Sequence, residues 1–177
     1  MGEIAMDLLM KKFYIFIFLV CNCAFSQNQF SSKIKSDCEI IISAMKNSDY
    51  NKILDYTYPK VIEIGGGREK LFSLMKNTLD KMKKEGYVFE NQILGEPQRI
   101  YNAGKELHCI VPKKTIIKTP KGRVEATYYL LAVSKDNGRR WFFIESHMLN
   151  DENKKLIFPN FNSDLKIPKN SKPVLID

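Results

Sequence analysis

The spacing of apolar residues changes near Gly86, from the period of a helix to the period of a strand. Residues three or four apart share one face of a helix, whereas residues two apart share one face of a strand. Ser48-Asp49 provides an N-cap and Gly86 a stop. The pattern predicts three amino-terminal helices: one over residues 30–46 (Phe30, Ile34, Cys38, Ile41, Ile42, Met45), one carrying Tyr50, Ile53, Leu54 and Tyr58, which Pro59 interrupts or extends, and one carrying Leu71, Phe72, Met75, Leu79 and Met82.

The second half of the chain reads as strands separated by turn residues such as Pro120-Lys121-Gly122 and Asp136-Asn137-Gly138. Helices followed by such a meander predict an α+β domain, with the helices packed on one face of a curved antiparallel sheet. Both faces of the last strands are apolar, so the pattern does not indicate which face lines a pocket. The predicted strands cover residues 87–94, 98–101, 106–111, 115–118, 123–133 and 140–148.

The amino terminus has the features of a secretory signal peptide. Met10-Lys11-Lys12 precede an apolar run over residues 13–20, and Ala24-Phe25-Ser26 offers a cleavage site after Ser26. The run is too short to span a bilayer as a helix. We therefore expect an exported protein, periplasmic or secreted, with residues 1–26 as the signal peptide and residues 1–9 as a spurious extension before Met10. Residues 27–149 would form the domain. Residues 150–177 would form an irregular tail, which can pack along the domain through Leu156, Ile157, Phe158 and Phe161.

Each pair of cysteines allows two interpretations. Cys21 or Cys23 could carry a lipid anchor, but Val20 and Asn22 precede them where a lipoprotein signal has small residues. Cys38 and Cys109 both lie on apolar stripes, so they form either one disulfide or two buried free thiols.

The formal net charge of the chain is +8. In an exported protein this favours anionic envelope components or acidic ligands over nucleic acid as partners. The lysine and arginine doublets are scattered, however, and such residues also form ordinary solvated surface. Gly65-Gly66-Gly67-Arg68 could hold a phosphate at a helix start, but it lacks the ending of a P-loop and is typical of a hinge.

The three helices, the bent meander and the segment Asp136-Asn137-Gly138-Arg139-Arg140-Trp141-Phe142-Phe143 together resemble the cone-shaped superfamily named after nuclear transport factor two, a cystatin-like roll. The resemblance covers residues 30–147. It implies an apolar pocket between sheet and helices. The superfamily includes isomerases, dehydratases, ligand binders and structural modules, so the resemblance implies a fold more than a function.

An acid-base enzyme of this kind would need a carboxylate or histidine and a tyrosine in an apolar cavity. The candidate catalytic residues are Tyr101, Tyr128, Glu145 and His147, and the candidate ligand-binding residues are Tyr56, Tyr58, Tyr128 and Trp141. Each also has an ordinary structural role open to it, as a packed aromatic or a solvated edge residue.

No cofactor, metal site or covalent nucleophile is expected, because the chain lacks short ligand spacings and nucleophile motifs. The sequence favours a non-catalytic ligand-binding or protein-interaction module in the cell envelope. Its partner would be a small apolar or anionic ligand or an envelope protein, with a homodimer through the sheet as a further possibility. The alternative is a small isomerase- or dehydratase-like enzyme.

Overall fold

The computed structural model describes residues 29–177, so the predicted signal peptide, with Cys21, Cys23 and the cleavage site after Ser26, lies outside the described residues. The chain divides into two compact units, Met1–Ser32 and Lys33–Asp177. Of the first unit, only the helical residues 29–32 are described. The second unit contains every other described element.

The helical half contains more helices than the sequence pattern predicts. Residues 33–46 are helical, and α2 (Tyr50–Asp55), α3 (Pro59–Ile64) and α4 (Arg68–Lys84) follow. The second predicted helix is therefore two short ones, because Pro59 fits the first turn of a new helix, where its missing N–H has no partner to lose. The predicted cap is confirmed: the Asp49 side chain accepts from the Lys52 N–H at 3.0 Å.

The other half is an antiparallel sheet, which confirms the α+β class. Its central order is β1 (Val88–Leu94), β3 (Glu106–Thr119), β4 (Gly122–Ser134), β5 (Phe142–Glu145). β2 (Tyr101–Ala103) also pairs with β3, and β6 (Val174–Leu175) pairs with β4. The last predicted strand is shorter than expected, because the 3-10 turn η1 (Ser146–Met148) follows β5 directly.

The prediction that residues 106–118 form two strands is wrong, since β3 runs through Pro112 without a break. The Pro112 carbonyl accepts from the Gly95 N–H at 2.8 Å, on the side where β1 has ended and β2 has not begun. The missing proline N–H faces the same side, because the N–H and C=O of one strand residue point the same way. A proline is tolerated at this gap in the sheet edge.

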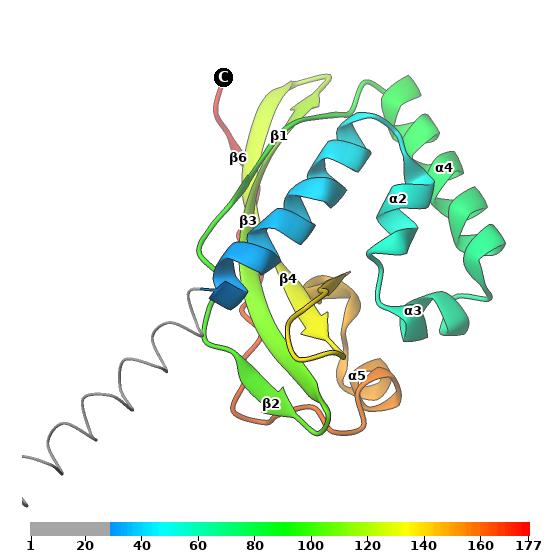
Figure 1. Ribbon diagram of the computed structural model, residues 1–177. Coiled ribbons are helices and arrows are strands. Elements are labelled where there is room, and N and C mark those ends of the chain that lie inside the picture. The colour runs from blue at the N-terminus through cyan, green and yellow to red at the C-terminus, as the bar shows by residue number, and fades with distance from the viewer. Residues whose placement is uncertain (1–28) are drawn as a thin grey trace, which may run out of the picture. The chain divides into compact units, whose positions relative to one another are not determined.

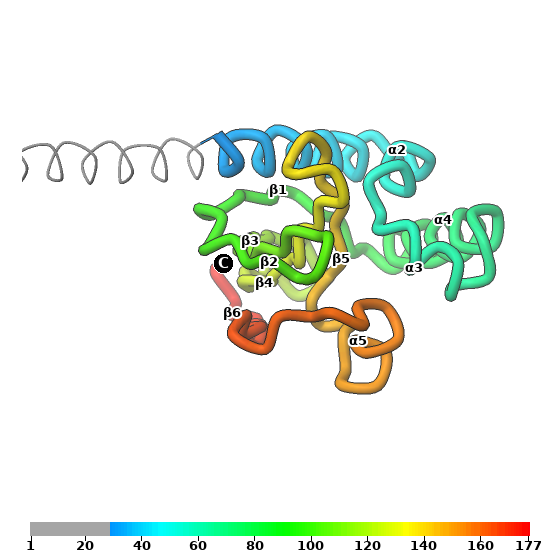
Figure 2. Tube along the Cα trace, turned by 60° about the horizontal axis from the view of Figure 1, so that its bottom comes forward, coloured from blue at the N-terminus to red at the C-terminus, as the bar shows by residue number. Residues whose placement is uncertain are grey.

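The sheet is covered on both faces (Figures 1 and 2). Helical residues 33–46 lie on the face that we call the helix side, and α5 and the carboxy-terminal segment lie on the opposite face, the tail side. Cross-strand register places Cys109, Val111, Lys113, Leu130, Ala132, Phe143 and Glu145 on the helix side, and His108, Ile110, Leu131, Val133 and Ile144 on the tail side.

The predicted irregular tail contains regular structure. Asn150 and Asn153 form a reciprocal capping box that starts α5 (Asp151–Ile157), a local signal that fixes the helix start. Ile157, Phe158 and Leu165 are buried and complete a hydrophobic core on the tail side. The tail thus forms a structural layer of the domain.

A candidate ligand cavity on the helix side

A cavity of ≈ 320 Å³ lies between the helices and the sheet. Helical residues 33–46 supply Cys38, Ile41, Ile42 and Met45 to one wall, and the strands supply Gln92, Lys113, Leu130, Phe143 and Glu145 to another. Most of the lining is apolar, with few polar groups, which is the usual composition of a small-molecule site.

Helix α4 forms one wall of this cavity and is only partly buried. None of its residues is buried, although Leu71, Leu74, Met75 and Leu79 face the cavity, and the Leu74 side chain is 60 % exposed. It contacts α2 and α3, including an edge-to-face pair of Phe72 with Tyr50 at 5.8 Å, and its Phe72, Met75 and Leu79 pack against the buried cluster of Ala44, Tyr50 and Ile53. A ligand in the cavity would bury apolar surface that α4 now leaves exposed.

The glycines before α4 shape the connection between α3 and α4. Gly66 and Gly67 have φ angles of 91° and 95°, which side chains of L-residues rarely allow. The Arg68 guanidinium donates to Asp55 Oδ1 at 2.8 Å and to the Asn51 carbonyl at 2.8 Å. Because the Arg68 guanidinium is engaged with α2, it is not free to hold a phosphate, and a hinge at this segment stays a prediction.

The charged groups of the cavity are Lys113 and Glu145. The Lys113 ammonium donates to Glu145 Oε1 across β4, and the side chains are 10 % and 33 % exposed. This ion pair adds little net stability, because the desolvation of the buried Lys113 ammonium offsets the attraction. The pair is therefore better explained as a polar contact point inside an apolar site than as a support for the fold.

Cys38 and Cys109, the two cysteines among the described residues, are free thiols and form no disulfide, in line with the second of the two interpretations. Cys38 faces the cavity beside Lys113 and Glu145, whereas the Cys109 thiol donates to the Gln98 carbonyl at 3.1 Å at the sheet edge. Burial raises the pKa of each thiol to about 12. Both thiols stay protonated at neutral pH, which makes them poor nucleophiles.

The four candidate catalytic residues do not converge. Glu145 lines the cavity, and Tyr128 lies on the same face, opposite Lys113 in the register. His147 is 55 % exposed, with Nδ1 4.0 Å from Glu145 Oε2. Tyr101 pairs with His108 and packs on the tail-side core.

Of the candidate ligand-binding residues, only Tyr56 lines the cavity. Trp141 is fully buried, and its backbone N–H donates to the buried Asp37 Oδ2 at 3.0 Å. Tyr58 packs against Phe158 on the tail side with ring centroids 4.9 Å apart. Tyr58 and Trp141 are thus packed in the interior of the domain.

The sequence interpretation missed Lys113 and a buried network on the tail side. Tyr58 donates to Glu106 Oε1 at 2.8 Å, and His108 Nε2 lies 3.2 Å from Glu106 Oε2. A signal for Lys113 existed, since it continues the inward alternation of Cys109 and Val111. The network had none, because Tyr58 comes from a different part of the chain.

Comparison of the chain with protein-family models, curated proteins and solved structures yields no match. Within residues 29–177, no group of three or more His, Cys, Asp or Glu side chains is arranged to hold a metal ion. In the same part of the chain, no helix has both the length and the apolar character needed to cross a membrane.

Proposed function

We propose that this protein binds a small, largely apolar molecule that carries a carboxylate, and that it does so in the helix-side cavity. The observation that carries the proposal is an apolar cavity whose wall contains the Lys113–Glu145 pair. Such a role fits the resemblance to the cone-shaped superfamily, whose layout implies a pocket between sheet and helices. With the expected export, binding would take place in the cell envelope or the medium.

The two side chains of the pair suggest how a carboxylate would be recognised. Lys113 is the more deeply buried partner, while Glu145 is one-third exposed and able to turn toward water. A ligand carboxylate can replace Glu145 on the Lys113 ammonium, so that the buried charge stays paired. The apolar part of the ligand would contact Met75 and Leu79 of α4.

The test compares decanoate with decanol by isothermal titration calorimetry. We expect the wild-type protein to bind decanoate at least about tenfold more tightly, since a hydrogen bond to a charged group commonly contributes that much. Lys113→Met should abolish this preference. Lys114→Met is the matched control, because Lys114 points to the other face and pairs with Glu125 at 3.0 Å.

Lys113→Met leaves Glu145 without its partner, so Lys113→Met/Glu145→Gln is measured in parallel to separate lost recognition from lost folding. Absence of binding by the wild-type protein, or an equal preference in both lysine variants, would contradict the proposal.

A second candidate function is acid-base catalysis of the isomerase or dehydratase type. The observation in its favour is the position of Glu145 in an apolar wall next to an ammonium, an arrangement able to take up and return a proton. This function requires that Glu145→Gln abolish turnover while decanoate binding persists.

A further inference from the structure

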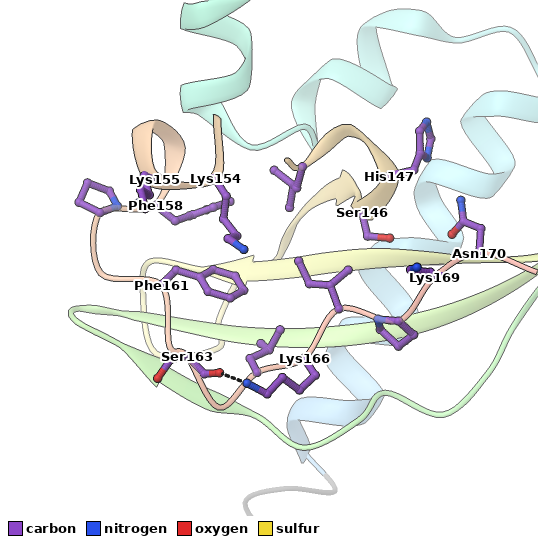
Figure 3. A pocket seen from close by; sticks show the side chains of 15 residues that line it. Ser146, His147, Lys154, Lys155, Phe158, Phe161, Ser163, Lys166, Lys169 and Asn170 are labelled. Atoms are coloured by element: carbon purple, nitrogen blue, oxygen red, sulfur yellow. Dashed lines mark hydrogen bonds between the residues drawn. The ribbon is translucent and has the colours of Figure 1, made fainter. Parts of the chain in front are cut away.

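A second and larger pocket, of ≈ 860 Å³, lies within the tail, between η1, α5 and the segment that follows α5 (Figure 3). We call it the tail pocket. It shares no residue with the helix-side cavity, and its lining comes entirely from residues 146–170. The two sites therefore use different side chains, although His147 of the tail pocket has its Nδ1 4.0 Å from Glu145 Oε2.

The tail pocket is strongly basic. Four lysines and a histidine are among its fifteen lining residues, none of which is Asp or Glu: Lys154, Lys155, Lys166, Lys169 and His147. The neighbouring Asp151 pairs with Lys154 at 2.9 Å, but its side chain is 94 % exposed. Several positive charges around one concave space attract an anion by the sum of their fields.

Two further polar groups, the Ser146 hydroxyl and the Lys169 ammonium, belong to the lining of this space. Ser146 is only 3 % exposed, and its hydroxyl has no hydrogen-bond partner in the part of the chain that the structure describes. Figure 3 shows this hydroxyl and the Lys169 ammonium on the same side of the pocket. Lys169 forms no ion pair with any residue from 29 to 177. A hydroxyl and an ammonium in the lining of one pocket are suited to an oxyanion.

The floor of the tail pocket is apolar. Phe158, Phe161, Leu165 and Ile167 line it, and the Lys154 ammonium lies over the Phe161 ring at 5.4 Å from its centroid. The charged groups thus surround a surface that an aromatic or aliphatic group can cover.

We propose that the tail pocket binds a phosphate group carried by a molecule with an apolar or aromatic part. A phosphate monoester carries nearly two charges and three acceptor oxygens at neutral pH, which match several ammonium groups and the Ser146 hydroxyl better than one carboxylate would. A soluble phosphate ester and a lipid headgroup share this chemistry.

The experiment uses the full chain and two probes. Phenyl phosphate is titrated by NMR, with phenol as the uncharged control. Vesicles of phosphatidylcholine with and without phosphatidate are tested by co-sedimentation. The variant Lys166→Gln/Lys169→Gln removes two charges from the pocket, and Lys83→Gln/Lys84→Gln removes two from the exposed end of α4.

We expect the pocket variant to bind the phosphate probe at least about tenfold more weakly than wild type, and the α4 variant to bind nearly as wild type. Phenyl phosphate binding indicates a soluble ester, whereas binding of phosphatidate vesicles alone indicates a headgroup. Equal weakening by both variants would mean general charge attraction and would overturn the proposal, as would wild-type binding no tighter than that of phenol.

Discussion

At the scale of single residues, the buried polar groups are the most informative part of this structure. His108 is fully buried beside Glu106, and the Phe158 and Phe161 rings pack around it at 4.9 and 5.6 Å. Its Nδ1 has no hydrogen-bond partner among the described residues. A charged imidazole would be costly in such a site, so the neutral form is favoured.

The first prediction concerns the pH dependence of folding. Burial lowers the pKa of His108 from its ordinary 6.5, although Glu106 acts in the opposite direction. The unfolded chain therefore binds this proton at a higher pH than the folded chain does. Stability should be fully present above about pH 6.5 and should fall on acidification, by at most about 1.4 kcal/mol per pH unit for one group.

Denaturant unfolding at a series of pH values measures this slope. His108→Gln should flatten it, even if the variant is less stable overall. His147→Gln changes the other, exposed histidine and should keep the wild-type slope. If His108→Gln has the same slope as wild type, another group causes the pH dependence.

At the scale of secondary-structure elements, the position of α4 depends on the glycines that precede it. Gly67 has φ 95° and ψ 169°, a region essentially restricted to glycine, and an added Cβ would meet no atom within 4 Å. A substitution at Gly67 therefore tests backbone strain without a steric clash.

The second prediction is that Gly67→Ala lowers the free energy of unfolding by about 1–3 kcal/mol, because alanine is strained in this conformation. Urea unfolding followed by circular dichroism measures the change. Asn77→Ala, at an exposed position of α4, should have little effect or stabilise slightly. A Gly67→Ala protein as stable as wild type would show that the link between α3 and α4 tolerates another conformation.

At the scale of the whole described domain, the sheet is buried on two faces by segments far apart in the sequence. Helical residues 33–46 come from the beginning and the tail from the end, and each completes a core that the sheet cannot close alone. We therefore expect the tail to be needed for folding. Substitutions at nearby tail positions should differ sharply in their effect on stability.

The third prediction compares two apolar residues of the tail that lie two positions apart. Phe158 is 1 % exposed and Leu156 is 59 % exposed. Phe158→Ala should cost about 3–5 kcal/mol, because it leaves a cavity in the tail-side core. Leu156→Ala should change stability by about 0.5 kcal/mol or less. Thermal unfolding of both variants measures the difference; similar losses would mean that the tail packs differently in solution.

Several features could be predicted because their signals are local. The change of hydrophobic period indicated the α+β class, Asp49 and Gly86 marked the ends of helices, and turns such as Asp136-Asn137-Gly138 separated the strands. Period, caps and turn residues act within a few positions of each other, so a single sequence contains the information. Pro112 led to a wrong strand boundary, because the energetic cost of a proline in a strand depends on whether a neighbouring strand needs the N–H that proline lacks.

The candidate sites depended on tertiary structure. The alternation of β4 placed Tyr128 and Leu130 on one face but could not say which layer would cover it, since both faces are apolar. Local patterns in the chain thus specify most of its helices, strands and turns, whereas packing in three dimensions brings Lys113 to Glu145, brings Tyr58 to Glu106, and folds the tail into a basic pocket. This division arises because burial and ion pairing depend on which groups lie opposite each other in space; the members of both pairs come from distant parts of the chain, and even the local tail takes its shape from the sheet that it covers.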